Sequence, residues 1–126
     1  MADEPKKIVI IEDEPDTAEM YAEMMRISGY EVVKYFSGGP AIAEIAEQKP
    51  DAIVLDIMMP DISGYDVLRY LKGESTLSNV PVIIVSAKTL PSDINQGMEA
   101  GATIYLTKPV TFNDLKTAID DAISQE

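Results

Sequence analysis

The chain alternates five apolar runs with five amphipathic stretches, and this alternation constrains its fold more than any other feature. The runs at residues 8–11, 52–55 and 82–85 are almost wholly apolar. Continuous apolar runs are typical of strands covered on both faces, as in a parallel sheet between two layers of helices. Five strand–helix units in succession therefore predict a doubly wound α/β sandwich with right-handed crossovers.

The second apolar run, at residues 31–36, differs because it carries Glu31 and Lys34. Charged side chains within a strand suit the edge of a sheet. With this strand at the edge, the order 2-1-3-4-5 is natural, as in flavodoxin-like folds. We therefore expect a flavodoxin-like (βα)5 three-layer sandwich with a five-stranded parallel sheet. The fifth strand is expected at residues 103–106, and helices are expected at 15–28, 39–48, 64–72, 92–100 and 112–124.

Local signals mark the ends of two helices. Pro15 suits a first helical turn, and Gly29 suits the position just after a helix end. Thr111, followed three residues later by Asp114, resembles a capping box. These signals support the expected boundaries of the first and last helices.

The length of 126 residues suits one domain with one core. We expect a single domain over residues 1–126, with its core at about 6–124 and no output domain. No apolar run is long enough to span a membrane, and the polar N-terminus lacks the apolar core of a signal peptide. A cytoplasmic location is therefore expected.

Composition excludes several kinds of chemistry. The chain has no cysteine and no histidine, which removes thiolate and imidazole catalysis and the usual ligands of transition metals. Its 22 acidic and 10 basic residues give a net charge of −12. Direct binding to nucleic acid is not expected, because such proteins need a cationic surface.

Polar residues follow the apolar strands at the points where the strands end. Ligands of doubly wound sheets bind beyond the carboxyl ends of the strands, so these residues are candidates for function. In the expected order, strands one, three, four and five are neighbours. Five side chains would therefore converge on one edge of the sheet: Glu12, Asp13, Asp56, Ser86 and Lys108.

Three carboxylates placed together repel one another, and a divalent cation would relieve that repulsion. Oxygen ligands suit Mg²⁺, which keeps several waters; we expect Mn²⁺ to substitute. Asp13 and Asp56 can bind directly, and Glu12 can reach the ion through a water. Beside the metal and Lys108, Asp56 could attack a phosphoryl group and Ser86 could donate a hydrogen bond to it.

Each of these residues also has an ordinary structural interpretation. The acidic residues 12–14 could simply complement a helix dipole. Asp56 could be a turn residue, Ser86 a helix cap, and Lys108 followed by Pro109 only a chain turn. Their joint placement at four strand ends favours a functional site over these separate explanations.

Four segments resemble the response-regulator receiver family: IVIIEDEP at 8–15, IVLDIMMPDISG at 53–64, VIIVSA at 82–87 and YLTKP at 105–109. The similarity covers essentially the whole chain. It implies that Asp56 is the phosphoacceptor and that Asp13 and Glu12 form the acidic pocket. It also implies that the Met58 backbone carbonyl completes the Mg²⁺ site.

The resemblance implies further roles. Lys108 would contact the phosphoryl group, and Pro109 would follow a cis peptide bond. Ser86 would move toward the phosphoryl group and Tyr105 would change rotamer, altering the surface made by the fourth helix, fifth strand and fifth helix. The protein would then be a phosphoacceptor switch rather than an enzyme.

The implied partners are a sensor histidine kinase or histidine phosphotransfer protein and a downstream effector or covalently linked output domain. The protein would work as a monomer or as a phosphorylation-dependent homodimer. Some positions depart from the commonest pattern of the family; among them, Glu12 stands where Asp is frequent and Ser86 stands where Thr is common.

Three other functions are alternatives for a chain with this pattern. A phosphatase of the haloacid-dehalogenase type needs a second Asp two residues after the nucleophile, where this chain has Met58. A flavodoxin-like cofactor site needs a phosphate-binding loop after the first strand, where the acidic residues 12–14 would repel phosphate. The third alternative is a receiver-like protein-interaction module that works without phosphorylation.

Overall fold

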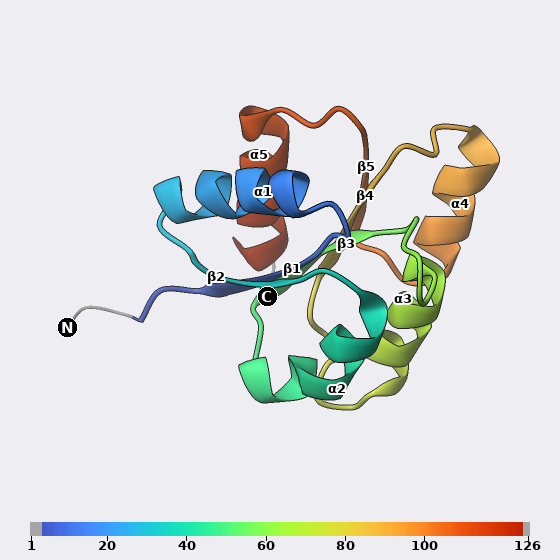
Figure 1. Cartoon of the computed structure of the whole chain (residues 1–126), viewed down its shortest axis with the longest axis horizontal. Coiled ribbons are helices and arrows are strands. Elements are labelled where there is room, and N and C mark those ends of the chain that lie inside the picture. Colours follow the sequence, from blue (N-terminus) through green and yellow to red (C-terminus); the bar gives the residue numbers. More distant parts are fainter. Residues whose placement is uncertain (1–3, 125–126) are drawn as a thin grey trace.

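Five parallel strands form one sheet in the order β2-β1-β3-β4-β5, and a helix follows each strand (Figure 1). The computed structural model describes residues 4–124. The strands are β1 (Lys7–Ile11), β2 (Glu31–Tyr35), β3 (Ala52–Asp56), β4 (Val82–Ser86) and β5 (Ile104–Thr107). The helices are α1 (Pro15–Ile27), α2 (Gly38–Gln48), α3 (Gly64–Gly73), α4 (Pro91–Glu99) and α5 (Phe112–Ser124).

The sheet lies between two helical layers, with α1 and α5 on one face and α2, α3 and α4 on the other (Figure 1). Successive side chains of a strand point to opposite faces. In β1, Ile8 and Ile10 pack in the cluster with α1 and α5, whereas Val9 and Ile11 pack in the cluster with α2 and α3. This confirms the expected three-layer sandwich and its strand order.

The predicted signals at the ends of α1 operate in the structure. Pro15 opens the helix, and the Glu14 side chain accepts a hydrogen bond of 3.1 Å from the Asp16 backbone N–H. Gly29 adopts a φ of 97°, a conformation that glycine reaches without steric cost. At α5, the Thr111 hydroxyl accepts a hydrogen bond of 3.0 Å from the Asp114 N–H.

Several boundaries differ slightly from those expected. β3 and β4 each extend by one residue, so that Asp56 and Ser86 are their last members. The parallel register explains this, because Asp56 lies opposite Val85 and Ser86 lies opposite Thr107. The two polar side chains therefore start from hydrogen-bonded strands rather than from loops. β5 begins one residue later than expected, and α4 begins one residue earlier, at Pro91.

The central strands β1 and β3 are neighbours, although their crossover helices lie on opposite faces of the sheet. Such a reversal of winding leaves a crevice beyond the carboxyl ends of the two strands. Within residues 4–124, no helix combines the length and apolar character that crossing a lipid bilayer requires.

Candidate functional site

Two buried carboxylates lie at the crevice between β1 and β3. The register pairs Ile11 with Leu55, which makes Glu12 and Asp56 the next residues on adjacent strands. Their exposed fractions are only 1% and 4%. Asp13 is partly exposed. Oxygen atoms of the three carboxylates lie within 4.8 Å of one another.

Lys108 reaches this cluster from the end of β5. Its Nζ atom lies 2.9 Å from Glu12 Oε1 and 3.4 Å from Asp56 Oδ2. Backbone groups hold the remaining carboxylate oxygens: Glu12 accepts a hydrogen bond of 3.1 Å from the Glu14 N–H, and Asp56 accepts one of 3.2 Å from the Met58 N–H. Both buried carboxylates are therefore held in fixed orientations.

The pKa values of Glu12 and Lys108 are shifted by burial and by the contact between the two groups. Burial raises the pKa of Glu12 to about 7, and the hydrogen bond from Lys108 opposes this increase. Burial by itself would lower the pKa of Lys108, but its hydrogen bond to Glu12 and the charge of Asp56 raise that pKa overall. One ammonium group thus contacts two of the three clustered carboxylates, and the site favours additional positive charge.

The donor atoms of this cluster fit a hard divalent cation. Carboxylate oxygens are the ligands that Mg²⁺ prefers, and Mg²⁺ commonly needs only one or two of them. Asp13 and Asp56 could hold the ion, with Glu12 acting through a water. The Met58 peptide lies at the same place, since its N–H bonds to Asp56; its carbonyl is a candidate further ligand.

Ser86 and Tyr105 are both hydrogen-bonded to the backbone of one residue, Lys88. The fully buried Ser86 hydroxyl accepts a hydrogen bond of 3.0 Å from the Lys88 N–H. The Tyr105 hydroxyl donates one of 2.8 Å to the Lys88 carbonyl. A displacement of Ser86 would therefore reach Tyr105 through Lys88. The Ser86 carbonyl also accepts a hydrogen bond of 2.8 Å from the Lys108 N–H, and the Lys108–Pro109 bond is cis.

The structure thus brings together Glu12, Asp13, Asp56 and Lys108, with Ser86 on the adjacent strand and Tyr105 connected to it. Sequence reasoning assigned no role to Gly64. A Cβ atom at this position would lie 2.3 Å from the Asp56 carbonyl oxygen and 2.5 Å from Ile57 Cα. Gly64 therefore lets α3 begin directly against the phosphoacceptor candidate. The glycine within segment 53–64 was the available signal.

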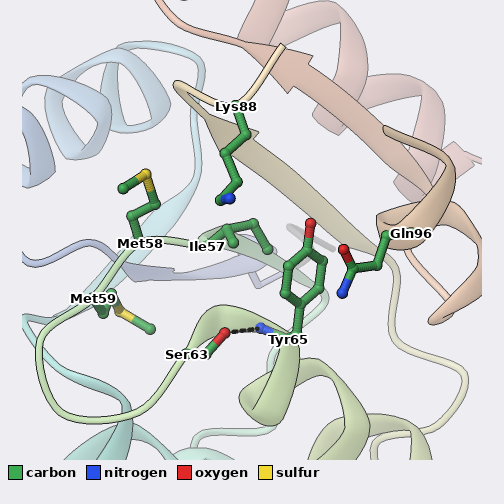
Figure 2. A pocket seen from close by; sticks show the side chains of 7 residues that line it. All are labelled: Ile57, Met58, Met59, Ser63, Tyr65, Lys88 and Gln96. Atoms are coloured by element: carbon green, nitrogen blue, oxygen red, sulfur yellow. Dashed lines mark hydrogen bonds between the residues drawn. The ribbon is translucent and has the colours of Figure 1, made fainter. Parts of the chain in front are cut away.

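A groove of about 620 Å³ adjoins the site, between the β3–α3 loop and α4 (Figure 2). Figure 2 shows the Lys88 side chain extending toward Ile57, with the Tyr65 ring beside Gln96. The groove is open and combines apolar with polar groups. Its lining residues are Ile57, Met58, Met59, Ser63, Tyr65, Lys88 and Gln96.

The sequence model of the response regulator receiver domain matches residues 8–120. The chain belongs to the response regulator receiver domain family. The receiver fold accounts for the parallel sheet and for the polar residues at the ends of its strands.

Among curated relatives of this receiver domain, the transcriptional regulatory protein PdtaR of Mycobacterium tuberculosis is 33% identical over 121 residues. That match covers 96% of this chain and 58% of PdtaR. The protein PilH of Pseudomonas aeruginosa is 34% identical, and the match covers 94% of this chain and 98% of PilH.

Solved structures agree with the receiver fold. A response regulator receiver domain protein from Clostridium thermocellum superimposes with a TM-score of 0.88 at 32% identity, covering 95% of each chain. The signal receiver domain of a histidine kinase from Syntrophus aciditrophicus gives a TM-score of 0.87 at 31% identity, covering 95% of this chain and 91% of that one. The recognition of the family from sequence is confirmed.

Proposed function

We propose that this receiver domain accepts a phosphoryl group on Asp56 in a Mg²⁺-dependent reaction. Domains of this family act as phosphoacceptor signalling switches. The observation that carries the proposal is the Lys108 ammonium group placed between the buried Asp56 and Glu12 carboxylates. Phosphoryl transfer depends mainly on positioning and on neutralising charge, which this arrangement supplies.

In the proposed reaction, an Asp56 carboxylate oxygen attacks the phosphorus of a phosphohistidine on another protein. A P–O bond forms, the P–N bond breaks, and its electron pair stays on the imidazole of the donor. When bound, Mg²⁺ supplies positive charge that offsets the negative charge of the carboxylates and phosphoryl oxygens. The Met58 N–H orients Asp56, while Lys108 and Ser86 offer donors to the phosphoryl oxygens.

The switch in this proposal runs through the backbone of Lys88. A phosphoryl group adds negative charge and three acceptor oxygens. If Ser86 turns its hydroxyl toward them, the hydrogen bond from the Lys88 N–H changes, and so does the Lys88 carbonyl that holds Tyr105. The surface formed by α4, β5 and α5 would then present a different face to an effector or output domain.

The donor in this proposal is a sensor histidine kinase or a histidine phosphotransfer protein, because this chain contains no histidine. The protein would work in the cytoplasm, as a monomer or as a homodimer formed on phosphorylation. We propose no direct binding to nucleic acid or to membranes. The net charge of −12 argues against nucleic-acid binding, since nucleic acid attracts cationic surfaces.

Incubation with acetyl phosphate and Mg²⁺, followed by intact-mass spectrometry, tests the acceptor. We expect a gain of one phosphoryl group that is lost in Asp56→Asn and in the presence of a chelator. Asp51→Asn is the matched control, because Asp51 accepts a hydrogen bond from the Lys7 N–H at the opposite end of the sheet. A stable adduct on the Asp56→Asn variant would refute the assignment.

An adduct that hydrolyses quickly could escape mass spectrometry, so beryllofluoride provides a second test. With Mg²⁺, this phosphoryl mimic should shift the NMR signals of Asp56 and Tyr105 in the wild type. No spectral response, together with demonstrated Mg²⁺ binding, would favour the alternative of an interaction module that works without phosphorylation.

A further inference from the structure

The loop between β3 and α3, residues 57–63, carries the candidate Met58 carbonyl ligand, and Asp61 lies near its far end. Asp61 Oδ1 accepts a hydrogen bond of 3.1 Å from the Gly38 N–H, and Oδ2 accepts one of 2.8 Å from the Gly39 N–H. Both glycines belong to the first turn of α2. One carboxylate therefore joins this loop to a helix more than twenty residues earlier in the chain.

The N-terminus of α2 is well suited to an external carboxylate. The first N–H groups of a helix lack partners within the helix, and its dipole favours negative charge there. The side chain of the N-cap residue Ser37 makes no capping hydrogen bond, and the first turn of α2 contains no acidic residue. Asp61 supplies both the acceptor and the charge, and the two hydrogen bonds lower its pKa.

The two glycines make this close approach sterically possible. A Cβ atom at Gly38 would lie 3.0 Å from Val67 Cγ2 and 3.1 Å from Ile62 Cβ. A Cβ atom at Gly39 would lie 3.2 Å from Asp61 Oδ2. The helix start and the loop are thus closely fitted, and a Cβ atom at either position would require the neighbouring side chains to shift.

The inner end of the same loop is held at the phosphoacceptor candidate. The Met58 N–H donates to Asp56, and the Gly64 N–H donates to the Ile57 carbonyl at 2.8 Å. Met58 is 56% exposed, so packing of its side chain does little to fix this residue. Hydrogen bonds at the two ends of the loop are therefore well placed to set the position of its backbone carbonyls.

We propose that Asp61 is a positioning residue for the metal site, acting by holding the 57–63 loop against α2. The inference rests on the proposed Mg²⁺-dependent function and adds a residue to it. Groups that orient metal ligands typically change metal affinity by about 10- to 100-fold when they are lost. Asp61 acts one step farther away, through the backbone of its own loop, and its effect should be smaller.

Asp61→Ala tests the inference, with Asp51→Ala as a matched control that removes a carboxylate acceptor of a backbone N–H far from the site. Calorimetric titration of the unphosphorylated protein measures the Mg²⁺ dissociation constant, and hydrogen exchange measures the opening of residues 57–63. We expect Asp61→Ala to raise the dissociation constant roughly threefold or more and to speed exchange in the loop. Asp51→Ala should do neither.

Gly39→Ala provides a second variant that keeps the Asp61 carboxylate but crowds it, in case Asp61→Ala folds poorly. Like Asp61→Ala, it should raise the Mg²⁺ dissociation constant. An unchanged dissociation constant in both folded variants, beside a wild type that binds Mg²⁺, would overturn the positioning role alone. A wild type that binds no Mg²⁺ would overturn the proposed function and this inference together.

Discussion

At the scale of single residues, the site depends on close contacts that leave little freedom. Lys108 lies between two buried carboxylates, and the Met58 N–H orients one of them. Gly64 has no side chain, and this is required because any side chain there would clash with the backbone of Asp56. Backbone atoms cannot rotate away as a flexible side chain can, so a Cβ atom at position 64 would force the backbone itself to move.

Gly64→Ala should therefore destabilise the protein by about 3 kcal/mol or more, the upper part of the range for overpacking. Urea unfolding measures this change. Gly73→Ala is the matched control in the same helix, because nothing lies within 4 Å of its Cβ position. The control should change stability by less than about 1 kcal/mol, in the stabilising direction expected for alanine in a helix. Equal effects of the two substitutions would contradict the proposed contact.

Asp61 gives a prediction about pH. Its hydrogen bonds to the Gly39 and Gly38 N–H groups lower its pKa below the ordinary value of 3.8. A carboxyl group whose pKa is lower in the folded state stabilises the fold at a pH above its unfolded-state pKa. That stabilisation is lost as the pH falls through the folded-state pKa. The stability difference between wild type and Asp61→Asn should thus be constant near neutral pH and shrink below pH 3.8. Urea unfolding across this range measures it, and a constant difference would contradict the assignment.

At the scale of elements, α4 approaches β4 and β5 through a buried glycine. A Cβ atom at Gly97 would lie 2.9 Å from Ile84 Cδ1 and 2.9 Å from Tyr105 Cδ2. The Tyr105 ring therefore occupies space that a larger residue on α4 would fill. This packing and the hydrogen bond to the Lys88 carbonyl together hold Tyr105 in its observed position.

Gly97→Ala should push the Tyr105 ring away and weaken its bond to Lys88. Alanine favours the helix by about 1 kcal/mol relative to glycine, which should offset part of the steric cost. We expect a small change in stability but clear shifts in the NMR signals of Tyr105. Met98→Ala is the control on the exposed side of α4, where the side chain is 42% exposed. Shifts of equal size in this control would argue against a specific contact.

At the scale of the whole molecule, the net charge of −12 disfavours the compact state through self-repulsion. Part of this negative charge is concentrated at the crevice, where Glu12, Asp13 and Asp56 meet. Monovalent salt screens the general repulsion, whereas a bound divalent cation relieves the local one. The two effects can be separated by experiment.

NaCl should raise the midpoint of urea unfolding by screening the surface charges. At matched ionic strength, Mg²⁺ at about 100 times its dissociation constant should add about 2.7 kcal/mol, the value expected for a ligand that binds only the folded state. This additional part should largely disappear in Asp13→Asn, while the response to NaCl stays. A Mg²⁺ effect that survives in Asp13→Asn would show binding elsewhere on the acidic surface.

Local patterns in the sequence were sufficient to predict the layers and the strand order. The apolar runs of β1, β3 and β4 require cover on both faces, and the charges in β2 favour an edge. Because parallel strands align their carboxyl ends, the meeting of Glu12, Asp56 and Lys108 also followed from sequence position alone.

Tertiary structure alone decided the contacts between elements distant in the sequence. The cap that Asp61 provides for α2 and the hydrogen bonds of Ser86 and Tyr105 to the Lys88 backbone have no local signal, and the glycine at position 64 does not by itself reveal its approach to Asp56. Each contact would be lost or strained by a shift of the elements relative to one another, and the packing of the elements sets their relative position. Periodicity and motif spacing determine which residues face the crevice, whereas their orientation there depends on the packing around them.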